Sequence, residues 1–116
     1  MQQVDVGKLA SIGAGLSLYA TPLSTFNAFR AVTSIGGALT LDMSNQVRDF
    51  TGLEALTLVS GDMIVHGNAQ LSSFVGLSRL HEIGGSLTIT GNPMLPAATS
   101  AAFAARVTVH GKVTIN

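Results

Sequence analysis

The side chains best suited to chemistry are two aspartates and a histidine in the middle of the chain: Asp42, Asp62 and His66. Asp42 and His66 are 24 residues apart, one period of an internal repeat, so we expect their Cβ atoms to face each other about 5 Å apart on adjacent strands. A carboxylate beside an imidazole suits acid–base chemistry or the beginning of a metal site. Zinc needs three or four ligands, however, and the remaining histidines, His81 and His110, fall at other positions of the repeat. We therefore expect a surface Asp–His pair and no metal site.

The remaining carboxylates do not form a catalytic cluster. Asp5, Asp49, Glu54 and Glu82 fall on different sides of the repeat, whereas glycoside cleavage needs two carboxylates facing one bond. The sequence also contains no nucleophile elbow, phosphate-binding loop or HExxH motif. These observations predict a protein that is not an enzyme and uses no cofactor.

Length and composition narrow the remaining functions. The chain has 116 residues, six basic and six acidic side chains and no cysteine, which fits one domain over residues 1–116, alone or within a longer repeat protein. A net charge of zero provides no basic stripe for phosphates, so nucleic acid is not an expected partner. No window approaches about 18 uninterrupted apolar residues, so membrane insertion is not expected either. Leu9–Ala20 only crudely imitates a signal peptide, because its leucines occupy repeat positions, and we expect none there.

An internal repeat organises the chain. Apolar residues recur at every third position in three runs that lie 24 residues apart: Leu23, Phe26, Phe29, Val32 and Ile35; Val47, Phe50, Leu53, Leu56 and Val59; Leu71, Phe74, Leu77, Leu80 and Ile83. Each run is followed by a small-residue corner and then by an alternating segment such as Leu39–Leu41 or Leu87–Ile89. Alternation predicts short strands, whereas a period of three drifts off any α-helical face and favours 3₁₀-like or extended backbone. The repeat therefore predicts an all-β fold, a parallel β-solenoid of about five coils of 23–26 residues.

Three further features refine this prediction. Glycine at the corners indicates sharp turns with unusual backbone angles. Ser44, Asn68 and Asn92 share one loop position, where stacked amides would connect consecutive coils. The alanine-rich stretch 96–105 predicts a short helix whose single large apolar residue, Phe103, covers the last core layer. Arg106 occupies a repeat position at which the other units have an apolar residue, so we expect the last coil to be irregular.

The segment L77-SR-L80-HE-I83-G-GS-L87-T-I89-TG-N92-PM-L95 resembles the receptor L domain. That domain is the leucine-rich, single-stranded, right-handed β-helix of the insulin and epidermal growth factor receptor ectodomains, also found in cell-surface proteins of fungi, protists and bacteria. The resemblance implies a right-handed parallel β-solenoid and a non-catalytic binding or structural module at an extracellular or cell-surface location. The animal domains carry cysteines and capping elements, and this chain departs from them in having no cysteine.

In solenoids of this kind the sheet face is the usual recognition surface. The expected ligand-binding face comprises Tyr19, Thr40, Asp42, Asp62, Ile64, His66, Thr88 and Thr90. Its expected ligand is a protein or a carbohydrate. The alternative interpretation is an ordinary solvated sheet face, because β-propensity alone selects threonine there.

The terminal coils indicate a second possible function, because the sequence shows no segment that would cap them. Copies of the chain would then stack end to end as subunits of an extracellular filament or sheet. The expected assembly interface comprises Val6, Leu9, Val113 and Ile115.

Overall fold

The structure is a computed structural model that describes residues 11–13, 15–20, 25–26 and 29–115. In chain order its elements are β1 (Ser11–Ile12), β2 (Leu16–Tyr19), β3 (Ser34–Ile35), β4 (Leu39–Asp42), β5 (Leu58–Val59), β6 (Met63–His66), β7 (Glu82–Ile83), β8 (Leu87–Thr90), α1 (Ala97–Arg106), β9 (Thr108–Val109) and β10 (Val113–Ile115).

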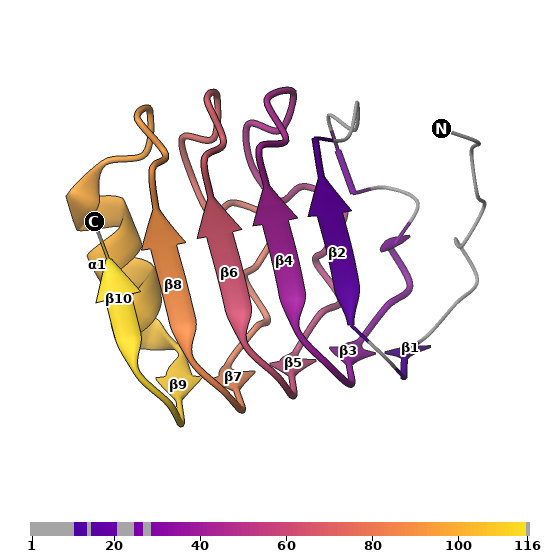
Figure 1. Cartoon of the computed structure of the whole chain (residues 1–116). Helices are drawn as coiled ribbons and strands as arrows, with labels where there is room; N and C mark the ends of the chain where they lie inside the picture. The colour runs from indigo at the N-terminus through magenta and orange to yellow at the C-terminus, as the bar shows by residue number, and fades with distance from the viewer. Residues whose placement is uncertain (1–10, 14, 21–24, 27–28, 116) are drawn as a thin grey trace.

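Each repeat unit contributes one strand to each of two parallel sheets. The two-residue strands form the order β1-β3-β5-β7-β9, and the longer strands form the order β10-β8-β6-β4-β2 (Figure 1). The register follows the sequence repeat, since Leu39 pairs with Met63 and Met63 with Leu87. The step from β8 to β10 is longer, because Leu87 pairs with Val113 and α1 lies between them. The alternating segments are therefore strands, as their period predicts.

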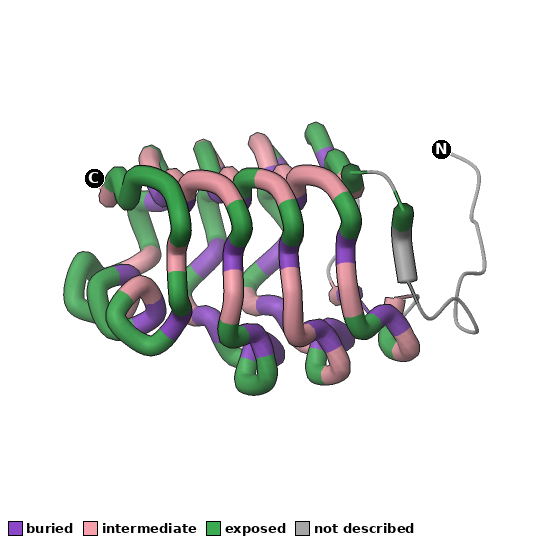
Figure 2. The backbone as a smooth tube through the Cα atoms, turned by 90° about the horizontal axis from the view of Figure 1, so that it is seen from below, coloured by how far each residue is buried: buried purple, intermediate pink, exposed green. Residues whose placement is uncertain are grey.

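The core lies between the two sheets and is built from columns of aliphatic side chains. Leu39, Met63 and Leu87 occupy one column, and none of them is more than 1% exposed. Figure 2 shows the same alternation of buried and exposed positions recurring from one repeat unit to the next. The period of two places every second strand residue in the core and leaves its neighbours on the outer face.

The runs with a period of three connect the sheets through successive turns. The N–H of Leu53 donates to the carbonyl of Phe50, and the N–H of Leu56 donates to the carbonyl of Leu53. Each turn is thus closed by a hydrogen bond to the residue three positions earlier. One aromatic ring from each run lies directly over the ring of the next unit: Phe26 and Phe50, like Phe50 and Phe74, have centroids 5.5 Å apart. The runs are chains of separate β-turns and not 3₁₀ helix, because Gly52 and Gly76, third in the first turn of their runs, have φ of +111° and +103°, as type II turns require.

A buried column of polar side chains joins consecutive units, as the loop position predicts. The Asn68 Oδ1 accepts the N–H of Ser44 at 2.9 Å, and the Asn92 Oδ1 accepts the N–H of Asn68 at 3.0 Å. The Asn68 amide also donates to the carbonyl of Leu41. Ser44 and Asn68 are fully buried, so these bonds satisfy groups that water does not reach.

The corner glycines correct one expectation about the turns. They do not occupy the left-handed region, and the positive φ angles are at other sites, such as Gly76 at +103°. Gly84 is instead required by close stacking, because a Cβ there would meet the backbone carbonyl of Ser60. Space between units therefore explains the glycine at most corners, although an added Cβ at Gly13 would have nothing within 4 Å.

The expected all-β fold, a right-handed parallel β-solenoid, is wrong. The structure is a compact α/β arrangement of two parallel sheets and one helix, with a radius of gyration of 12.8 Å, close to the ~13 Å of a globular chain of this size. The helix forms because residues 97–106 are rich in alanine, the strongest helix former, and Phe103 anchors it to the core, where it is 3% exposed. Arg106 does not continue its apolar column, because its guanidinium donates to the carbonyls of Leu77 and Leu80.

Candidate functional site

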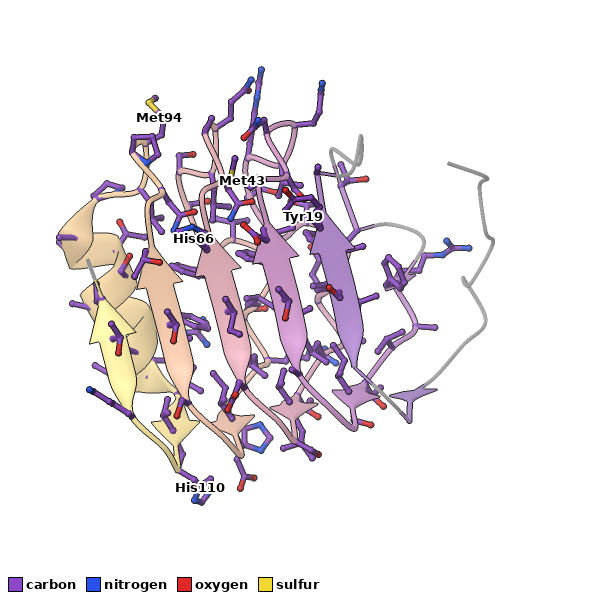
Figure 3. The ribbon with its side chains drawn as sticks, viewed as in Figure 1. Tyr19, Met43, His66, Met94 and His110 are labelled. Carbon is purple, nitrogen blue, oxygen red and sulfur yellow. The ribbon has the colours of Figure 1, made fainter. Side chains whose placement is uncertain are left out.

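The outer face of the sheet formed by β2, β4, β6, β8 and β10 is the candidate site. Each of the four-residue strands places two side chains on this face, so the sequence-predicted residues form two rows across the sheet (Figure 3). The row at the strands' C-terminal ends comprises Tyr19, Asp42, His66 and Thr90. The second row comprises Ser17, Thr40, Ile64, Thr88 and Thr114.

The terminal row brings three different functional groups together. Tyr19 pairs with Asp42 and Asp42 with His66, so a phenol, a carboxylate and an imidazole lie on consecutive strands. The Tyr19 side chain is 67% exposed, the largest exposure among the apolar and aromatic side chains of this face. The His66 Nδ1 lies 2.8 Å from the Thr90 Oγ1, which fixes the ring toward β8. The predicted in-register position of Asp42 beside His66 is confirmed.

Asp42 has an unusual environment for a surface carboxylate. Its Oδ1 is buried and has no hydrogen-bond partner among the residues that the structure describes. Within the same part of the chain the one ion pair joins His110 to Glu82 at 2.8 Å, so Asp42 and His66 are adjacent without being bonded. A buried and unpaired carboxylate oxygen is energetically costly, and in this conformation the Oδ1 is closed to solvent.

Met43 is a site residue that the sequence analysis missed. It follows β4, is 43% exposed and has a φ of +54°, in the left-handed region. Its sulfur lies beside Gly67, because a Cβ on Gly67 would be 2.6 Å from the Met43 Sδ and 3.7 Å from the Asp42 Oδ1. The available signal was the repeat itself, since Gly67 and Gly91 occupy the equivalent turn position in the next two units.

The remaining predicted face residues lie outside the terminal row. Thr40, Ile64 and Thr88 are half-buried in the second row. Asp62 is exposed at the corner before β6, and its Oδ1 accepts the N–H of Ser86 at 2.8 Å. Asp62 therefore connects two units through the backbone and stands apart from the terminal row.

Only two of the four residues of the expected assembly interface lie in the described part of the chain. Val6 and Leu9 lie outside the described residues. Val113 and Ile115 lie on β10, where Val113 is 43% exposed and Ile115 is half-buried.

Two hollows lie away from the sheet face. A groove of about 630 Å³ runs between α1 and the preceding turns and is lined by residues that include Phe74, Val75, Phe103 and Arg106. A polar hollow of about 390 Å³ is lined by Thr25, Gln46, Arg48, Asp49, Thr51 and Gln70. Neither contains a residue of the terminal row.

Metal, membrane and family comparisons add no further assignment. Across the described ranges, no three histidine or carboxylate side chains are grouped so as to hold a metal ion. In that same portion of the chain no helix is long and apolar enough to span a membrane. No protein-family model matches the chain, and the searches of curated proteins and of solved structures likewise give no significant match.

Proposed function

We propose that this protein is a non-catalytic recognition module that binds an oligosaccharide on the outer face of the β2-β4-β6-β8-β10 sheet. The observation that carries the proposal is the terminal row, where the exposed ring of Tyr19 is followed in register by Asp42 and His66. The resemblance of residues 77–95 to the receptor L domain supports a location at a cell surface.

The size of the face favours a small, extended ligand over a folded protein. Four-residue strands are about 13 Å long, and five strands at about 4.8 Å spacing give a face of roughly 300 Å². A standard protein–protein interface buries about 800 Å² on each partner. A protein ligand would have to extend well beyond this sheet, whereas an oligosaccharide fits within it.

The chemistry of the face favours a sugar over a peptide strand. The backbone N–H and C=O groups of the central strands are used in the parallel ladders, so the face offers side chains and no main-chain edge for strand addition. The face offers one aromatic ring for the C–H surface of a sugar, together with hydroxyl, carboxylate and imidazole groups for its hydroxyls.

A glycan array probed with purified protein, followed by calorimetric titration of the strongest ligand, tests this proposal. Tyr19→Ala and Asp42→Ala each remove a contact, and we expect each to weaken binding at least tenfold, which corresponds to about 1.4 kcal/mol. Tyr19→Phe keeps the ring and should retain most of the affinity. Val75→Ser changes an equally exposed apolar residue, 63% exposed, on the groove away from the sheet and should leave binding unchanged.

Two outcomes would reject the oligosaccharide face. One is an array without a saturable ligand. The other is a ligand whose affinity is the same for the native protein, Tyr19→Ala and Asp42→Ala.

A further inference from the structure

The unit that contains β9 and β10 has core-column residues that are more exposed than those of the units before it. Val113 is 43% exposed, whereas Leu87, Met63 and Leu39, the preceding members of its column, are at most 1% exposed. Val109 and Ile115 are half-buried, while Ile83 and Ile89 in their columns are at most 1% exposed. Among the described residues, the layer formed by Val109, Val113 and Ile115 therefore has apolar surface in contact with water.

Among the described residues β10 is an edge strand of its sheet. Within the described part of the chain β10 pairs with β8 alone. The N–H of Leu87 donates to the carbonyl of Lys112, so the alternation of a parallel ladder turns the N–H and C=O groups of Val113 and Ile115 away from β8. An edge of this kind is a template for another strand.

An occupant that matches this edge is a strand parallel to β10 that brings its own aliphatic side chains to the core columns. Strand β2 of the same chain has this pattern, with Leu16 and Leu18 turned inward and Ser17 exposed on the outer face. The N–H of Leu16 donates to the carbonyl of Ala38, so the peptide groups of Ser17 point to the edge away from β4. Leu16 is also only half-buried, whereas its register partner Leu39 is 1% exposed.

We propose that β10 of one copy pairs in parallel with β2 of a second copy, with Val113 opposite Leu16 and Ile115 opposite Leu18. This register repeats the pairing of β8 with β10 and of β2 with β4, and it places Thr114 opposite Ser17. A formal charge of zero leaves no net repulsion between copies. Because the two edges differ and lie at opposite ends of the sheet, the contact is head to tail and generates rods (Figure 1).

The test uses two proline variants that each remove one outward N–H. Val113→Pro blocks the β10 edge and Ser17→Pro blocks the β2 edge, while the bonds to β8 and β4 use other peptide groups. We expect native protein to grow in mass with concentration in light scattering and to form rods in negative-stain microscopy. Each variant alone should stay at the 11.9 kDa mass of the monomer. An equal mixture should form a dimer of twice that mass, because one intact edge of each kind remains.

Matched variants distinguish a loss of edge pairing from a loss of folding and from a loss of binding on the sheet face. Thr114→Lys adds a charge to β10 on the outer face and should still assemble, whereas Val113→Lys places the same charge on the open column and should not. Circular dichroism must show that the Pro and Lys variants retain the native spectrum. Tyr19→Ala, which tests oligosaccharide binding, should assemble normally, so the two proposals fail independently.

Three results would overturn this pairing. Native protein that stays monomeric over the whole concentration series excludes it. A dimer that persists in Ser17→Pro and is lost in Val113→Pro indicates two β10 strands paired with each other. Assembly that both proline variants retain assigns the contact to another surface.

Discussion

Phe103 of α1 stacks on Phe74 with ring centroids 4.2 Å apart, nearer than the 5.5 Å between Phe74 and Phe50. The helix thus supplies the fourth ring of a column that the turns of the repeat begin. The Arg106 guanidinium lies 5.2 Å from the Phe103 ring centroid, so the last ring also carries a cation–π contact. This arrangement explains how one apolar side chain docks a helix made mostly of alanine.

Replacing Phe103 with alanine should remove the anchor of α1. We expect a loss of about 3–5 kcal/mol in the free energy of unfolding, because the ring is 3% exposed and its removal leaves a cavity over Phe74. Urea denaturation followed by circular dichroism measures the change. Phe103→Leu should cost less, and Ala101→Ser, on the exposed side of the helix, should change stability by less than about 0.5 kcal/mol. Equal effects of Phe103→Ala and Ala101→Ser would show that the ring does not anchor the helix.

The buried asparagine column should behave as one coupled unit. Asn68→Ala removes the acceptor of the Ser44 N–H and two amide donor bonds, so we expect it to cost about 2–4 kcal/mol. Asn92→Ala should cost a similar amount, and the double variant should cost less than the sum, since the two amides share a bond of 3.0 Å. A double-mutant cycle in urea measures this coupling.

The exposed Asn45 provides the comparison for that cycle. Its Oδ1 accepts the N–H of Ala69 at 3.2 Å, the same type of bond in solvent, and Asn45→Ala should cost less than about 1 kcal/mol. Strictly additive effects of Asn68→Ala and Asn92→Ala would contradict the stacked-amide interpretation.

Much of the strand structure is predictable from the sequence, because burial on one face of a sheet forces the period of two seen at Leu39–Leu41 and Leu87–Ile89. The amide column is predictable for a similar reason, since Ser44, Asn68 and Asn92 recur at one repeat position. The helix at residues 97–106 was also predictable from its alanines and from Phe103, but the all-β fold class was assigned from the repeat alone and left this helix out. The repeat does not give how closely Phe103 packs on Phe74, because that distance depends on how the helix is oriented over the core.

Of the candidate site, only the pairing of residues on adjacent strands was predictable from the sequence. Asp42 and His66 lie side by side because the repeat has a fixed length. The burial of the Asp42 Oδ1 depends on packing at the turn after β4, where Met43 replaces the glycine of the later units. Such packing is set by side-chain conformation in three dimensions, which a spacing rule does not describe.

Gly76 should tolerate no residue with a Cβ without loss of stability. Its φ is +103°, and an added Cβ would meet the backbone carbonyl group of Phe50. Gly76→Ala must therefore move one repeat unit away from the next, and we expect it to cost at least about 2 kcal/mol. Gly13→Ala is the control, because its Cβ would have nothing within 4 Å and its φ is not positive. Thermal unfolding of both variants decides whether the loss of stability comes from the contact of the added Cβ with Phe50 or from the loss of glycine itself.

Met43→Gly should stabilise the protein, although it removes a side chain. A left-handed residue with a Cβ costs about 1–2 kcal/mol, whereas the extra freedom of glycine in the unfolded chain costs about 0.5–1 kcal/mol, so a net gain of about 0.5 kcal/mol is expected. Gly67→Ala should be destabilising in the native background, because its Cβ would lie 2.6 Å from the Met43 Sδ at a φ of +68°. The same substitution should cost less in the Met43→Gly background, where the sulfur is gone and only the backbone strain remains. Chemical denaturation of the four proteins gives this coupling directly. An identical cost of Gly67→Ala in both backgrounds would show that the Met43 side chain moves aside freely. A loss of stability in Met43→Gly would show that the packing of the Met43 side chain beside Asp42 outweighs the strain of the Met43 backbone.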